Sequence, residues 1–174
     1  DVYKRQVDAC DFTEYVKQDN LTAQTQCVQE PDRFGTAGGA LRVQDNNTWY
    51  QAKPDIYFVD DLTITAWVKV YSVSSWARLL DFSNGPAQNS VFLSLTSGLD
   101  GKPVFSINTN GIEQPIYSST ALGLGTWTHL AATLSGQTQT IYINGTSVAS
   151  GPLLVGGGPP YGPSRAYCYI GKSA

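Results

Sequence analysis

The chain has 174 residues, a length that suits one domain with a sizeable hydrophobic core. Only 14% of the residues are charged, and the 17 glycines and 9 prolines accompany many Thr, Ser, Val and Tyr residues, which favours strands and turns over helices. The net charge of −3 provides no basic surface for a nucleic acid, and no apolar run reaches the ~18 residues of a membrane-spanning helix.

The beginning of the chain has an unusual composition. The sequence contains no methionine, and we expect an internal fragment or a processed product of a longer protein. Its first six residues, DVYKRQ, match the translation of a transposon adapter used in sequencing libraries. Our hypothesis is that residues 1–6 are adapter-derived and extraneous; the alternative is an ordinary polar segment.

Residues 7–32 form a polar, irregular segment that carries two of the three cysteines. A disulfide between Cys10 and Cys27 would clasp this segment, closing a loop of roughly 15 residues worth about 3 kcal/mol in the chain-entropy model. Cys168 is then unpaired or has an external partner, unless it pairs with one of the other two. Three reduced cysteines in a cytosolic domain are the alternative.

Three N-glycosylation sequons favour an extracellular, secreted glycoprotein. Their acceptor residues are Asn20, Asn46 and Asn144.

From residue 33 onward, short strand-like segments alternate with turns. The clearest, residues 62–70, has an outward row containing Thr63, Trp67 and Lys69. Its inward row consists of Leu62, Ile64, Ala66, Val68 and Val70. Further strands are predicted at residues 39–44, 49–52, 76–83, 90–95, 102–108 and 167–170. Strands at this spacing, with no helical stripe between them, predict a β-sandwich or barrel.

The stretch from Thr126 to Val148 predicts three strands joined by two tight turns. The apolar residues Leu130, Ala132 and Leu134 alternate with polar and aromatic ones, and a similar alternation follows around residues 140–144. The turns are predicted at residues 135–136 and 144–145, and the second has the Asn-Gly sequence that most favours a hairpin.

Several of these segments together resemble a known family. Six segments carry the resemblance: DRFG…GGALRV, DLTITAWVKV, RLLDFSNG, TWTHLAATL, IYINGTSV and YIGKS. In their order and spacing they resemble the laminin-G-like, concanavalin A-like superfamily over about residues 32–173. The resemblance implies an all-β fold, an antiparallel jelly-roll sandwich of two sheets in residues 33–174. It also implies a closing strand after the YIG segment, which this sequence lacks, so we expect an incomplete domain or a gap filled by the N-terminal segment or another chain.

The acidic residues do not predict an enzyme. Some glycosidases with this jelly roll use two carboxylates that flank the scissile bond, whereas the glutamates here, Glu14, Glu30 and Glu113, are scattered. The only histidine, His129, lies on a strand face without a nucleophile partner. We therefore expect no catalytic residues.

The resemblance also implies a calcium site at one rim of the sandwich. Asp81 and Asn84 flank a turn and are the candidate ligands. The alternative is that both side chains cap backbone groups of the turn.

Aromatic residues outside the inward rows suit a sugar-binding face or a protein interface. The candidates for glycan binding are Trp49, Tyr50, Trp76 and Tyr161. The alternative explanation is that aromatic residues favour strands regardless of any ligand.

Two functions follow from these patterns, and a glycoside hydrolase-like enzyme is a remote third alternative. The first is a non-catalytic extracellular module of a larger secreted glycoprotein, which binds a glycan or protein ligand. The second is a structural subunit of an extracellular filament, appendage or coat, whose partners are further copies of itself. No nucleic acid and no membrane insertion are expected.

Overall fold

A computed structural model describes residues 22–23, 28–43, 48–58, 61–86, 88–109, 111–154 and 164–174. Within these ranges the chain forms thirteen β-strands. The described residues include no helix long and apolar enough to cross a membrane.

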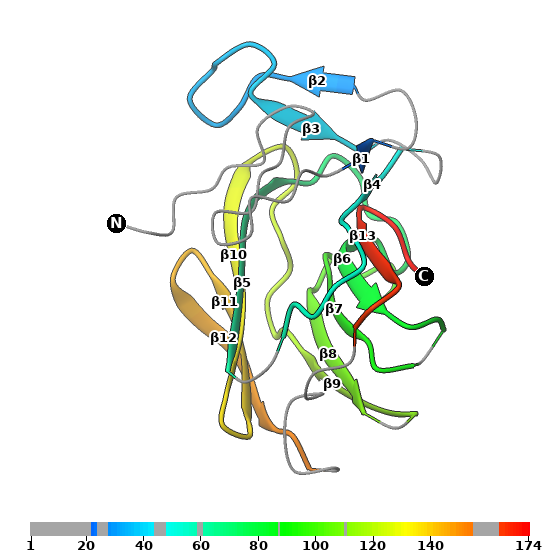
Figure 1. Cartoon of the computed structure of the whole chain (residues 1–174). Coiled ribbons are helices and arrows are strands. Elements are labelled where there is room, and N and C mark those ends of the chain that lie inside the picture. The colour runs from blue at the N-terminus through cyan, green and yellow to red at the C-terminus, as the bar shows by residue number, and fades with distance from the viewer. Residues whose placement is uncertain are drawn as a thin grey trace.

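Two antiparallel sheets pack face to face (Figure 1). The smaller has the order β12-β11-β10-β5 and contains β5 (Leu62–Lys69), β10 (Trp127–Ser135), β11 (Thr138–Ile143) and β12 (Thr146–Pro152). The larger has the order β1-β4-β13-β6-β7-β8-β9 and contains β1 (Thr22–Ala23), β4 (Tyr50–Gln51), β6 (Arg78–Ser83), β7 (Val91–Ser94), β8 (Val104–Thr109), β9 (Ile112–Tyr117) and β13 (Tyr167–Ile170). A separate pair joins β2 (Val28–Glu30) to β3 (Ala40–Arg42). This all-β sandwich confirms the predicted fold class.

The smaller sheet follows the predicted alternation. In β5 the predicted inward row is buried, while Thr63 and Thr65 are exposed. Leu130 of β10 pairs with Ala66, so the two inward rows lie side by side. Both tight turns form, although the first is centred on residues 136–137: Gly136 has a φ of 56°, as a type II′ turn requires at that position.

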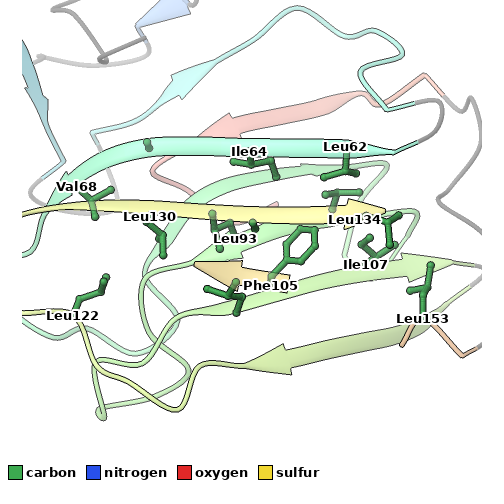
Figure 2. Packing of buried hydrophobic residues seen from close by; sticks show 14 of the residues in the cluster. Leu62, Ile64, Val68, Leu93, Phe105, Ile107, Leu122, Leu130, Leu134 and Leu153 are labelled. Carbon is green, nitrogen blue, oxygen red and sulfur yellow. The ribbon is translucent and has the colours of Figure 1, made fainter. Parts of the chain in front are cut away.

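The hydrophobic core fills the space between the sheets. Figure 2 shows Leu62, Ile64 and Val68 of β5 facing Phe105 and Ile107 of β8. Phe105 and Ile107 are completely buried, and burial of each such side chain contributes about 1.5–3 kcal/mol. Because side chains alternate along a strand, the residues between these point to the outer face of the larger sheet.

Strand β9 is absent from the sequence-based prediction. It contains Glu113 and Pro115 and carries no clear apolar row. A proline fits there because β9 is the last strand of the larger sheet and pairs only with β8. Strand propensity alone therefore missed this edge strand. The edge of β9 that faces away from β8 pairs with no strand of the described sheets.

Cys168 lies in a small second core with Tyr50, Ala52 and Phe82 and is completely buried. Its thiol is free, and its Sγ lies 3.4 Å from the Arg165 carbonyl oxygen. An external disulfide partner would require β13, which is paired on both sides, to separate from a neighbour and expose the thiol, and that alternative stays a prediction.

Several predictions concern residues outside the described ranges. These are the disulfide between Cys10 and Cys27, the sequons at Asn20 and Asn46, and Tyr161. The proposed segment boundaries and the missing closing strand stay predictions.

Candidate functional site

The outer face of the larger sheet carries polar and aromatic side chains in cross-strand rows. One row runs through Tyr169, Asp81, Phe92, Ser106 and Pro115. A second runs through Arg78, Ser94, Val104 and Tyr117. Polar side chains with little exposure are unusual on a sheet face that points away from a core, so this face is the natural place to search for a site.

A β-bulge in β6 brings Arg78 onto this face. Arg78 pairs with Ser94, and Leu80 pairs with the adjacent Leu93, so two residues of β6 oppose one of β7. In a regular strand, residues three apart point to opposite faces. The extra residue, Leu79, resets the alternation and places Arg78 beside Asp81.

A cleft of about 150 Å³ opens on this face, between the turn that follows β6 and the edge strand β9. Residues of β6, β7 and β9, which belong to the larger sheet (Figure 1), contribute to its lining. Its lining residues are Arg78, Asp81, Gly85, Pro86, Ser90, Phe92, Glu113, Ser173 and Ala174. The cleft therefore combines one cation, two carboxylates and one aromatic ring.

The guanidinium of Arg78 is held on three sides. Its centre lies 3.9 Å from the centroid of the Phe92 ring, and its Nε donates to Asp81 Oδ2 at 3.3 Å. Its terminal nitrogen also donates to Ser94 Oγ. The side chains of Arg78 and Asp81 are only 13% and 7% exposed, so this is a largely buried ion pair.

The two oxygens of Asp81 have different surroundings. Oδ2 also accepts long hydrogen bonds of 3.4 Å from Ser173 Oγ and the Ala174 N–H. Among the described residues, no group donates to the buried Oδ1. Burial raises the pKa of Asp81, and the neighbouring Arg78 partly offsets this effect.

Asn108 and Glu113 complete the polar part of this face. Asn108 is fully buried; its Oδ1 accepts from the Gly111 N–H at 3.1 Å, while its Nδ2 has no partner among the described residues. Glu113, paired with Asn108 across the strands, accepts from Ser106 Oγ at 3.3 Å. The face thus carries an unpaired acceptor on Asp81 and an unpaired donor on Asn108.

The predicted calcium ligands already have other hydrogen-bond partners in this structure. The oxygen of Asp81 that makes contacts faces the cationic Arg78, and Asn84 Oδ1 accepts from the Ala166 N–H at 3.0 Å. No group of three or more His, Cys, Asp or Glu side chains within the described ranges could hold a metal. Asn84 therefore caps a backbone group, which was the alternative interpretation.

The predicted aromatic residues do not form one platform. Tyr50 is 1% exposed and belongs to the second core, so a sugar cannot reach its ring, and that prediction is wrong. Trp49 is half-buried against Tyr169, with ring centroids 4.6 Å apart, and Lys172 Nζ covers its ring at 4.0 Å. Trp76 is 41% exposed and lies just before β6.

The sequence analysis missed the three other charged or aromatic side chains of the cleft, namely Arg78, Phe92 and Glu113. The alternation of residues 90–95 places Phe92 opposite the apolar row, which is a usable signal. The position of Arg78 on this face depends on the bulge in β6, and the position of Glu113 depends on the edge strand β9, which was not predicted. Neither side chain could therefore be placed from the periodicity of the sequence.

Another cavity of about 150 Å³ lies between β3 and the ends of β5 and β6. Its lining is mostly apolar and includes Leu41, Val43, Val68, Leu79, Leu95 and Ile170. At its rim Glu30 accepts hydrogen bonds from Tyr71 and Arg42, and both lower the pKa of Glu30. We therefore place the candidate site in the polar cleft.

Sequence comparison identifies a family. Residues 44–174 match the model of the concanavalin A-like lectin/glucanases superfamily. The chain belongs to this superfamily. No protein of curated function matches the sequence.

Several solved structures of this superfamily's fold are similar. Domain 4 of AbnA, a GH43 extracellular arabinanase from Geobacillus stearothermophilus solved with arabinotriose, has a TM-score of 0.68 and 18% identity over 90% of this chain and 74% of that one. The carbohydrate-binding module CBM66 of Bacillus subtilis has a TM-score of 0.53 and 14% identity over 97% and 96%. Domains LG4-5 of the mouse laminin α1 chain have a TM-score of 0.52 and 21% identity. The match covers 70% of this chain and 31% of the laminin chain. At these identities the likeness establishes the fold alone.

Proposed function

We propose that this superfamily member is a non-catalytic extracellular module that binds an uncharged oligosaccharide in the cleft beside Asp81. The observation that carries the proposal is the Oδ1 atom of Asp81, a buried acceptor without a partner among the described residues, in a cleft of about 150 Å³. A buried polar atom left unpaired costs about 1–3 kcal/mol. A sugar hydroxyl that donates to this oxygen would remove that cost.

The other cleft groups fit the same ligand. A sugar hydroxyl is both donor and acceptor, so it can donate to Asp81 and accept from a neighbouring group. The exposed carboxylate of Glu113 offers a further acceptor. The Phe92 ring is covered by Arg78, so it orients the guanidinium and offers no stacking face of its own.

The charges favour a neutral sugar. Among the described residues, the cleft contains the carboxylates of Asp81 and Glu113 and one cation, Arg78, which already pairs with Asp81. A carboxylated or sulfated sugar would place a further anion against this set, and like charges at short distance repel. The whole chain is also acidic, with a net charge of −3.

The similar structures support the choice of ligand class. One of them is a domain solved with arabinotriose, and another is named as a carbohydrate-binding module. The extracellular location is supported by the Asn144 sequon, whose acceptor residue is exposed in a hairpin turn.

The test is binding of the full chain to immobilised polysaccharides, with arabinan, xylan, mannan, galactan and β-glucan as neutral probes and pectate and heparin as acidic probes. Replacing Asp81 by Asn removes the carboxylate with little change in shape but leaves the buried Arg78 without its anion, so thermal unfolding first verifies that the variant is folded. We expect an affinity about tenfold to a hundredfold lower. Asp100→Asn is the matched control, because Asp100 is exposed, caps the Lys102 N–H and lines neither cavity.

Retention of full affinity in Asp81→Asn would overturn the site, and binding to the acidic probes alone would overturn the ligand class. A stable oligomer that binds no polysaccharide would instead support the structural-subunit hypothesis.

A specific observation also favours a second candidate, glycoside hydrolysis. Asp81 and Glu113 line one cleft, and Asp81 has the raised pKa of a general acid. Binding remains the better choice, because Asp81 already pairs with Arg78 and its Oδ2 is shared by three donors. Release of reducing ends from the bound polysaccharide, abolished by Asp81→Asn and by Glu113→Gln, would establish hydrolysis in its place.

A further inference from the structure

Trp76 adopts a backbone conformation that its side chain disfavours. Its φ is 57°, in the left-handed region. The other described non-glycine residues with positive φ are Asn89 and Asn144, and asparagine tolerates this region far better than a bulky residue does. A tryptophan at such a position is an outlier, and outliers of this kind concentrate at functional sites.

The turn around Trp76 is fixed by neighbouring backbone. The Ala77 N–H donates to the Ser74 carbonyl at 3.2 Å, and Thr96 Oγ1 donates to the same carbonyl at 2.7 Å. The Leu95 N–H then donates to the Ala77 carbonyl at 2.7 Å, which ties the turn to the end of β7. The conformation at residue 76 is therefore imposed by the turn, and glycine would adopt it without strain.

What tryptophan provides at this position is an exposed ring. The residue is 41% exposed, and its ring centroid lies 5.4 Å from the guanidinium centre of Arg78. The same guanidinium lies against Phe92 and donates to Asp81 inside the cleft. Arg78 thus separates Trp76 from the cleft by the width of one side chain.

We propose that Trp76 is a second sugar subsite, on which one ring of an uncharged oligosaccharide stacks while the adjacent ring occupies the cleft beside Asp81. The inference rests on the proposed function and deepens it, because it assigns the site to chains of at least two sugars. The face of an aromatic ring is electronegative and attracts the C–H groups of a sugar ring. The strain at residue 76 is the cost of presenting that face beside Arg78.

The experiment compares monosaccharide and trisaccharide binding by calorimetry. The probes are arabinose with arabinotriose, and the monosaccharide and trisaccharide of whichever neutral polysaccharide the protein binds. For Trp76→Ala we expect trisaccharide affinity to fall about three- to tenfold, with monosaccharide affinity unchanged. Trp76→Tyr should restore most of the loss.

Phe34→Ala is the matched control, since Phe34 is 71% exposed and lines neither cavity. It should change neither affinity, and thermal unfolding of each variant verifies that it is folded. An unchanged trisaccharide affinity in Trp76→Ala, or an equal loss for both probes, overturns the second subsite while Asp81→Asn still reports on the cleft. A wild-type protein that binds no sugar overturns the proposed function itself.

Discussion

Arg78 and Asp81 form an ion pair on the outer face of the larger sheet although they lie three residues apart on one strand. The bulge at Leu79 makes this possible, since regular alternation would direct one of the two side chains into the core. The pair is largely buried, so each charge is stabilised mainly by the opposite charge of its partner and only slightly by water. The cleft is therefore built by a backbone irregularity in β6.

Removing Arg78 should destabilise the fold. In Arg78→Ala the Asp81 carboxylate stays buried without its cation, and we expect the free energy of unfolding at pH 7 to fall by about 3 kcal/mol. Urea denaturation measures this. Replacing both residues, as Arg78→Met with Asp81→Leu, removes the uncompensated charge and should recover most of the loss. A double variant as unstable as Arg78→Ala would contradict this account.

The raised pKa of Asp81 makes stability and binding depend on pH in opposite directions. Between the ordinary value of 3.8 and the raised value, the folded state binds more protons than the unfolded state. The free energy of unfolding therefore decreases as pH rises through this window. The ionised carboxylate is the better acceptor for a sugar hydroxyl, so affinity should increase over the same window.

Asp81→Asn removes the titrating group, and both effects should be smaller in this variant. Urea denaturation and sugar binding at several pH values between 3 and 7 measure the two effects. Identical pH profiles of wild type and Asp81→Asn would show that another group is responsible.

The fold was largely predictable from the sequence, whereas the cleft was not. Alternation identified β5 and β10 because one face of each strand is buried and the other exposed. It failed for β9, an edge strand with a proline and no apolar row. Arg78 and Glu113 lie on the bulge and on that edge strand, and such irregularities depend on strand pairing, which a local pattern does not contain.

The strain at Trp76 can be measured by comparing two truncations. Trp76→Ala and Trp76→Gly both remove the ring, but only glycine adopts a φ of 57° freely. We expect Trp76→Gly to be about 1 kcal/mol more stable than Trp76→Ala. Glycine normally weakens a folded chain relative to alanine, so the inverted order in chemical denaturation is diagnostic, and the usual order would show that residue 76 is unstrained.

The thiol of Cys168 should be unreactive in the folded protein. Burial raises its pKa to about 11, so almost no thiolate exists at pH 8. Maleimide labelling followed by peptide mass spectrometry should therefore find Cys168 unmodified in native protein and modified in denaturant. The denatured sample is the control for reagent access, and rapid native labelling would show that β13 opens readily.

The hairpin residue Asn144 can carry a glycan without losing its structural contact. Its Oδ1 accepts from the His129 N–H at 2.9 Å, and N-glycosylation modifies the amide nitrogen, so the contact oxygen stays available. We expect a glycan at Asn144 when the chain is secreted from eukaryotic cells, detected as a glycopeptide by mass spectrometry. Thr146→Ala removes the sequon but keeps the Asn144 contact, so it should abolish the glycan with little effect on stability.

Asn144→Ala should instead lower the free energy of unfolding by about 2 kcal/mol, because it loses the hydrogen bond and places alanine at a φ of 50°. Asn144→Gly keeps the conformation and should cost only about 1 kcal/mol. Equal stability of Asn144→Ala and Thr146→Ala would show that the side-chain contact does not stabilise the hairpin.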